Sequence, residues 1–470
     1  MTDLDLAYTP ATELARCIAA RELSPVEVVE NSLARIAEVN PTLNCFCFTF
    51  EQEALEKARA AESAVADGKP LGPLHGVPIA IKDLTPTKGK RTTLGSFSHE
   101  HWVPDYDAAI VDKLLAAGAI MVGKTNTPEF AYSSFTESPL WGITRNPWNP
   151  ERSPGGSSGG SGAAVASGCV PLAEGSDMGG SVRIPAALCG IAGLKPSFGR
   201  IPFDILPSQF DQISHFGPLA RTIGDIALFL SVAQGPDERD IQSQKPALDI
   251  PIPPPCDLAG MSLALCPDLG YYALNGEVEA NLHAAAEALR EAGAEVVEVE
   301  LDWDLSINRA WYDHWGVYLA AFFGHLLKDW RDKMDPNVAA LMDKGLAMSA
   351  VDFKRLEFIR TKQWQSLAPI LTRHDALICP TMAQPAKPVG GSDSDVTVDK
   401  NDGRFHGYDM TELFNFVSQC PAFSVPSGFT ADGLPTSLQI IARRFDDNAA
   451  LRIGAALEKF RPWAHKRPPI

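Results

Sequence analysis

The sequence lacks the features that mark membrane, secreted and nucleic-acid-binding proteins. Its longest apolar runs, such as 226–230, are far shorter than the roughly 20 residues that span a bilayer. The N-terminal segment has neither a basic stretch nor an apolar one, so we expect no secretory signal. Basic residues are in deficit, and the net charge of −17 disfavours nucleic acid and anionic membranes as partners. We therefore expect a cytoplasmic protein that binds neither.

A metal or disulfide pattern is also missing. The nine cysteines are scattered and odd in number, which indicates free thiols in a reducing compartment. None of the ten histidines forms an HExxH motif or pairs with a CxxC motif, so we expect no metal site. Cys45 and Cys47 belong to an alternating run that predicts a strand over 43–50 and argues against half a metal site.

What is present is the composition of a folded globular protein, with 45% hydrophobic and 21% charged residues. Helical and strand patterns alternate along the whole length without repeats, which predicts an α/β fold with a large mixed sheet wrapped by helices. A Pro-rich stretch at 245–256 is typical of a connection between lobes. Residues 303–375 are expected to be helical, and 390–404 to form a polar loop.

The N-terminal part gives clear local signals. Ser24 to Glu27 form a capping box that predicts a helix ending at Asn40-Pro41, and 51–66 is a second amphipathic helix. The apolar run that begins at Val77 predicts a strand with Lys82 at its end. Most lysines are solvated surface charges, whereas this placement indicates a partly buried ammonium group.

Two motif matches are rejected on their context. Gly118 to Thr125 matches the phosphate-binding pattern GxxxxGK[ST], but its four variable residues form an apolar, strand-like run instead of a loop. Gly156 to Gly160 matches the GxSxG nucleophile elbow, centred on Ser158, but no strand can precede it because of Pro150 and Pro154.

The segment 155–200 is the most informative stretch. Its glycine-serine clusters are embedded in apolar sequence, which disfavours a flexible linker and indicates backbone packed close to another group. We expect a strand over 170–173, a turn over 175–180 and a helix that opens at Ser181 with Pro185 in its first turn. Unpaired N–H groups at such a helix start could bind a substrate carbonyl as an oxyanion hole.

A nucleophilic serine in this setting needs a base. No histidine is near in sequence, but a buried lysine is an alternative because desolvation favours its neutral form. Lys82 is the natural candidate, and a serine of the first glycine-serine cluster could relay the proton to it.

These motifs resemble those of the amidase signature family, and the resemblance covers most of the chain. It is carried by the segments 76–83, 123–129, 155–161, 175–183, 189–190, 193–196, 433–435 and 467–469. The resemblance implies a single domain over 1–470, with a large twisted mixed sheet covered by helices on both faces. Within it, the catalytic core would span about 70–230 and a variable, substrate-side helical region about 303–375.

The resemblance also implies a set of site residues. Ser181 matches the nucleophile, Ser157 the bridging serine that follows a cis peptide, and Lys82 the base. Four consecutive backbone N–H groups would form the oxyanion hole, those of Met178, Gly179, Gly180 and Ser181. Three residues would support the site, Ser158, Asp177 and Arg183. No metal or cofactor would be needed.

We therefore expect an amidase that hydrolyses a small-molecule carboxylic amide to the acid and an amine or ammonia. Two alternatives are the glutaminase component of a tRNA-dependent amidotransferase and a catalytically inactive scaffold. Ile184 departs from the glutamine usual in those glutaminase components, and Met178 from the threonine of many members. The runs 141–150 and 155–166 look most like bacterial stand-alone amidases.

Specificity is expected to come from segments around 130–145, 303–375 and 400–415. Their aromatic residues favour an apolar or aromatic acyl group. The sequence is compatible with a homodimer.

Overall fold

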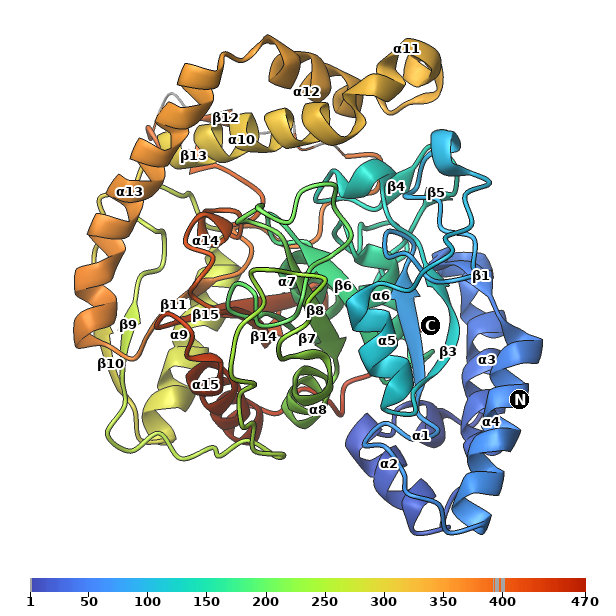
Figure 1. Cartoon of the computed structure of the whole chain (residues 1–470). Helices are drawn as coiled ribbons and strands as arrows, with labels where there is room; N and C mark the ends of the chain where they lie inside the picture. The colour runs from blue at the N-terminus through green and yellow to red at the C-terminus, as the bar shows by residue number, and fades with distance from the viewer. Residues whose placement is uncertain (1, 392, 394–396, 399–401) are drawn as a thin grey trace.

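An 11-stranded mixed sheet runs through the molecule (Figure 1). The computed structural model describes residues 2–391, 393, 397, 398 and 402–470. The strand order is β1-β3-β2-β6-β8-β7-β14-β15-β11-β9-β10, and strands from both sides of the Pro-rich stretch 245–256 join it. The strands are β1 (Phe46–Thr49), β2 (Pro78–Lys82), β3 (Ile120–Thr125), β6 (Leu172–Asp177), β7 (Ala192–Lys195), β8 (His215–Ala220), β9 (Ser262–Leu265), β10 (Glu295–Glu298), β11 (Ala376–Pro380), β14 (Ala422–Phe429) and β15 (Pro435–Ala442). Two further ladders are short, β4 (Glu137–Ser138) with β5 (Gly142–Ile143) and β12 (Thr397–Val398) with β13 (Phe405–His406).

Helices cover both faces of the sheet because alternate strand residues on each face are apolar. On one face, where Ile79 and Ile81 point, lie α2 (Ala11–Ala19), α5 (Ala109–Ala116), α8 (Ile223–Ala233), α9 (Gly276–Glu291) and α15 (Asp447–Phe460). On the other face, where Ala80 and Ala173 point, lie α3 (Pro25–Leu43), α4 (Glu51–Ala66), α6 (Gly159–Ala166) and α7 (Arg183–Cys189). The predicted α/β fold with a mixed, two-sided sheet is confirmed.

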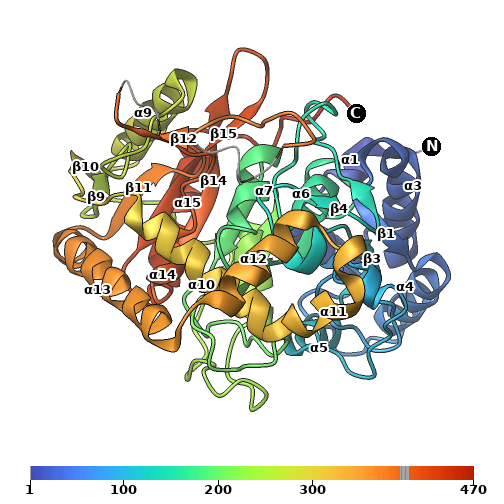
Figure 2. The same cartoon turned by 90° about the horizontal axis from the view of Figure 1, so that it is seen from above.

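A group of helices from the predicted helical region lies over one edge of the sheet, as the view from above shows (Figure 2). It consists of α10 (Ser306–Phe323), α11 (Leu327–Trp330), α12 (Pro336–Ala347) and α13 (Ala350–Arg373), and the short α14 (Leu413–Phe416) packs against α10. Their apolar side chains form a separate core with residues of β9, β11 and β15. None of the helices among the described residues is both long and apolar enough to cross a bilayer.

The sheet brings two chemically important strand ends together. Strands β2 and β6 are neighbours and parallel, with Ile79 opposite Leu172 and Ala80 opposite Ala173. Parallel neighbours end at the same edge of a sheet. Lys82, which ends β2, therefore lies beside the loop that follows Asp177 at the end of β6.

The boundaries of β6 correct the sequence prediction. The strand runs over Leu172–Asp177, so the predicted strand at 170–173 is wrong in extent and the expected turn at Gly175 is part of the strand. All six residues pair with β8, and Gly175 stands opposite Gly217. A Cβ at Gly175 would lie 2.8 Å from Ser158 Oγ, so this glycine serves close packing within a strand.

The first long helix also differs from prediction. It continues past Asn40-Pro41 to Leu43, and Asn44 caps it in the left-handed conformation. Pro41 lies in the last turn, where few hydrogen bonds remain to be lost. The expected polar loop at 390–404 is described only in part, because residues 392, 394–396 and 399–401 lie outside the described residues.

Candidate active site

Lys82 is fully buried at the end of β2 and contacts three hydroxyl groups. Its Nζ lies 2.7 Å from Ser157 Oγ and 3.0 Å from both Ser158 Oγ and Ser176 Oγ. Burial lowers the pKa of Lys82 to about 7, although two buried carboxylates nearby oppose the shift. Near neutral pH a large fraction of such amines carries a free lone pair, which can accept a proton from a hydroxyl.

Burial alone does not distinguish Lys82, because Lys124 and Lys195 are also fully buried. Burial lowers the pKa of Lys124 to about 8 and that of Lys195 to about 7. Lys124 Nζ donates to Thr85 O and Thr92 Oγ1. Among the described residues, Lys195 Nζ donates only to backbone carbonyls. Lys82 differs in having three hydroxyl partners. Because Lys124 lies within β3, the GxxxxGK[ST] match forms a strand and no phosphate-binding loop.

The first glycine-serine cluster connects Lys82 to the loop that carries Ser181. The Gly156–Ser157 peptide is cis. A Cβ on Gly156 would lie 2.5 Å from Ser133 O, so only glycine fits. Ser158 N–H donates to Ser181 O at 3.2 Å. Residues 153–157 form no strand, which excludes a nucleophile elbow at Ser158.

Ser181 lies in the loop 178–182, between β6 and α7, and its side chain borders a cavity of about 510 Å³. The helix begins at Arg183, two residues after the predicted start, and Pro185 lies in its first turn as predicted. Ser181 is 8% exposed and is one of the residues that line the cavity.

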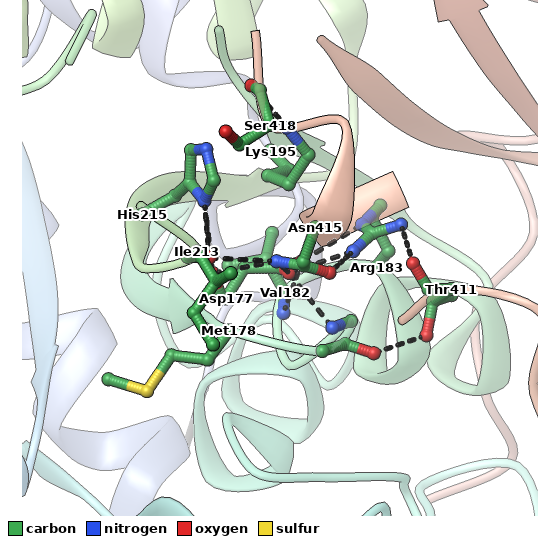
Figure 3. Close-up of polar contacts among 12 residues, drawn as sticks. Asp177, Met178, Val182, Arg183, Lys195, Ile213, His215, Thr411, Asn415 and Ser418 are labelled. Carbon is green, nitrogen blue, oxygen red and sulfur yellow. Dashed lines mark hydrogen bonds and ion pairs between the residues drawn. The ribbon is translucent and has the colours of Figure 1, made fainter. Parts of the chain in front are cut away.

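The backbone N–H groups of this loop are not equivalent. Gly180 N–H donates to Asp177 Oδ1 at 2.8 Å, which differs from the prediction that it faces a substrate oxygen. Within the described part of the chain, the N–H groups of Met178, Gly179 and Ser181 have no protein acceptor. Of these three residues, Gly179 and Ser181 line the cavity. The Met178 side chain extends away from Asp177 and Arg183 (Figure 3) and lines a small apolar pocket together with Leu84 and other residues.

Asp177 and Arg183 form a buried ion pair beneath the loop (Figure 3). The guanidinium donates to both carboxylate oxygens at 2.8 and 2.9 Å, and further to Thr411 O, Asn415 Oδ1 and Gln439 Oε1. Burial alone would raise the pKa of Asp177, but the charge and hydrogen bonds of Arg183 hold it well below its usual value. The carboxylate also accepts from Gly180 N–H, so it fixes the loop to α7.

Much of the cavity wall comes from three segments that fall in the regions predicted to set specificity, residues 131–134, 305–315 and 405–412. Aromatic side chains supply much of it, namely Tyr132, Trp311, Tyr312, Trp315, Phe405 and Tyr408. Ile184 also lines the cavity. Three carboxyl groups lie on the wall at Asp393, Asp409 and Glu412. Burial and the Asp409 charge raise the pKa of Asp393 to about 6 and that of Glu412 well above its usual value.

The prediction that 400–415 contributes to specificity did not single out the buried polar residues around α14. Thr411, Glu412 and Asn415 are buried polar residues that contact the loop or the cavity. They stand in an otherwise apolar run, and polar residues in such a run are expensive to bury without a partner. The presence of polar residues in an apolar run is therefore the sequence signal that could have identified these three residues.

Comparisons with known proteins agree on one family. The family model described as amidase matches residues 27–451. An acylamidase of Rhodococcus erythropolis is 38% identical, with 100% of this chain and 98% of the relative covered. The A-type component of the glutamyl-tRNA(Gln) amidotransferase of Chloroflexus aurantiacus (strain ATCC 29366 / DSM 635 / J-10-fl) is 36% identical, with 99% of each covered. The crystal structure of a bacterial aryl acylamidase of the amidase signature enzymes superposes with a TM-score of 0.91 at 30% identity, with 97% of each chain covered.

Proposed function

This chain belongs to the amidase signature family, and the relatives described above include two acylamidases. We propose that it hydrolyses a carboxylic acid amide through an acyl-enzyme on Ser181. The observation that carries the proposal is the contact of a buried, low-pKa lysine with the hydroxyls of Ser157 and Ser158. Ser158 N–H in turn donates to the backbone carbonyl of Ser181, which lines the cavity. A lysine base lets a serine attack without a histidine.

The proposed proton path runs from Ser181 through Ser157 to Lys82. The neutral amine of Lys82 takes the Ser157 proton, Ser157 takes the Ser181 proton, and Ser181 Oγ attacks the amide carbon. The same path returns a proton to the departing nitrogen, and the carbon–nitrogen bond breaks. Water, deprotonated by the same relay, then hydrolyses the ester to release the acid and free Ser181.

The N–H groups of Gly179 and Ser181 are the proposed donors to the oxyanion. They border the cavity and have no protein acceptor within the described residues. A donor of this kind contributes about 3–4 kcal/mol to transition-state stabilisation. Gly180 N–H, which is bound to Asp177, positions the loop in this proposal and does not contact substrate.

The substrate is proposed to be an amide with an apolar or aromatic acyl group. The aromatic wall of the cavity and Ile184 favour burial of such a group. A relative of known structure is an aryl acylamidase, which agrees with this choice.

The second candidate function is that of the glutaminase component of an amidotransferase, since such a protein is 36% identical over almost the full length. Ile184 argues against it. Its apolar side chain lines the cavity at the position where those proteins usually have glutamine. The substrate distinguishes the two candidate functions. A stand-alone amidase of the proposed kind hydrolyses arylamides, whereas the glutaminase component hydrolyses free glutamine.

The test is peptide-level mass spectrometry after reaction with a fluorophosphonate probe. We expect labelling at Ser181 in the wild type and at least about a 100-fold slower labelling in Lys82→Met, which keeps an unbranched side chain one atom shorter and removes the amine. Lys344→Met, which changes an exposed lysine at the cavity rim, is the matched control and should label at the wild-type rate. Labelling at Ser158 in place of Ser181 contradicts the mechanism, and no labelling together with no amide turnover favours the inactive scaffold.

A further inference from the structure

The carbonyl groups of the loop that carries Ser181 are all held by hydrogen bonds. Gly180 O accepts from Ile184 N–H at 2.7 Å, and Ser181 O accepts from Ser158 N–H. The two carbonyls before them are held by side chains from distant segments. Trp311 Nε1 of α10 donates to Met178 O at 3.1 Å, and Thr411 Oγ1 donates to Gly179 O at 2.6 Å.

Because a trans peptide is planar, a hydrogen bond to its C=O group also fixes the direction of its N–H group. The C=O of one residue and the N–H of the next belong to the same rigid unit and point in opposite directions. The bond from Trp311 to Met178 O therefore sets the direction of Gly179 N–H. The bond from Thr411 to Gly179 O sets that of Gly180 N–H, which Asp177 binds from the other side (Figure 3).

Trp311 and Thr411 pack directly against the two glycines of the loop, Gly179 and Gly180. A Cβ on Gly179 would lie 2.3 Å from Trp311 Cζ2, and one on Gly180 would lie 1.9 Å from Thr411 Oγ1. Gly180 also has a φ of +124°, which L side chains rarely adopt. The absence of side chains at both positions is thus what lets the indole and the hydroxyl reach the backbone.

We propose that Trp311 is a positioning residue that aims the Gly179 N–H at the developing oxyanion, with Thr411 fixing the adjacent peptide unit. This rests on the proposed function, since it assigns a role in the same Ser181 chemistry. Trp311 is the one side chain among the described residues that bonds the Met178–Gly179 unit. Its indole is 9% exposed and borders the cavity, so it acts from the wall through the backbone.

The alternative is that Trp311 serves only as an apolar wall for the substrate. The neighbouring Trp315 offers a matched control, because it lines the same cavity and is similarly buried. Its ring centroid lies 5.0 Å from that of Trp311. Its buried Nε1 has no hydrogen-bond partner among the described residues. Replacing each tryptophan with phenylalanine removes an indole N–H that is bonded in one case and unbonded in the other.

The experiment measures kcat and KM with an aryl anilide, with active sites counted by fluorophosphonate titration. We expect Trp311→Phe to lower kcat per labelled site at least about tenfold with KM changed less than threefold. Affinity for an aryl trifluoromethyl ketone, which forms a tetrahedral adduct, should fall by the same factor as kcat/KM. Trp315→Phe should change KM and leave kcat within about twofold.

An isosteric replacement keeps the test valid if Trp311→Phe does not fold. 3-Benzothienylalanine at position 311 retains the bicyclic shape and lacks the N–H group, and it should reproduce the loss in kcat. Wild-type kcat and ketone affinity in that protein would overturn the inference, as would a change in KM alone. Activity that survives Ser181→Ala would instead overturn the proposed function, so the two failures are distinguishable.

Discussion

Lys82 Nζ and Ser157 Oγ lie 2.7 Å apart in a fully buried environment, and burial lowers the lysine pKa to about 7. A hydrogen bond of this length allows a proton to pass between the two groups only if the amine is neutral. The catalytic competence of the site therefore depends on pH in a predictable direction.

The first prediction concerns the pH profile. Below pH 7 the amine of Lys82 is mostly protonated and cannot serve as a base, so kcat/KM should rise about tenfold per pH unit up to about pH 7 and then level off. The measurement is kcat/KM of an anilide from pH 5 to pH 9, alongside a thermal melt at each pH. A profile that is flat or that falls between pH 6 and pH 8 contradicts the assignment of Lys82 as base.

The second prediction concerns stability. Between pH 7 and the lysine's ordinary pKa of 10.5, the unfolded chain binds a proton at Lys82 that the folded chain does not, so the unfolding free energy rises with pH. From pH 7 to pH 9 the wild type should gain up to about 2–3 kcal/mol relative to Lys82→Met.

Urea denaturation at pH 7, 8 and 9 measures this difference. The exposed Lys354→Met is the control for loss of a lysine, and its stability should follow the wild type at all three pH values. Parallel pH dependence of the wild type and Lys82→Met would show that the folded lysine keeps its ordinary titration.

The third prediction concerns the buried pair of Asp177 and Arg183. Asp177→Asn leaves a buried guanidinium without its counter-charge and should cost about 3–5 kcal/mol of unfolding free energy. The amide also keeps only one acceptor oxygen for the bonds that the carboxylate accepts from Gly180 N–H, Val182 N–H and Arg183, so activity should fall in the protein that remains folded. The exposed pair of Arg331 and Asp343 is the comparison, and Asp343→Asn should leave the urea midpoint unchanged. Equal midpoints for both variants would show that the buried pair adds nothing.

The local parts of the fold could be predicted because their signals are local. The helix 51–66 has the predicted bounds, since its apolar period and the turn after it are visible in sequence. Lys82 could be singled out because a lysine at the end of an apolar strand breaks the usual pattern. The extent of β6 could not, because it depends on pairing with β8, which follows some 40 residues later.

The contacts that Trp311 and Thr411 make with the loop 178–182 were even less predictable from sequence. Trp311 and Thr411 bind consecutive carbonyls but come from positions more than 130 and 230 residues after them. No periodicity relates such positions, and only the packing of α10 and the segment before α14 against the sheet edge brings them together. The hydrogen bond from Gly180 N–H to Asp177 could not be predicted for a related reason, since the resemblance assigned Asp177 only a supporting role.

The last prediction concerns the acyl group. With the same 4-nitroaniline leaving group, the benzoyl amide should have a kcat/KM at least about tenfold higher than the acetyl amide, because burying the ring against the aromatic wall contributes about 2 kcal/mol. The shared leaving group isolates the acyl side of the cavity. Trp315→Ala should reduce this ratio and leave the acetyl amide little affected, since the small acyl group does not reach the wall. Faster hydrolysis of the acetyl amide would refute an aromatic acyl site and direct attention to the carboxyl groups at Asp409 and Glu412, which would then select a polar or cationic substrate.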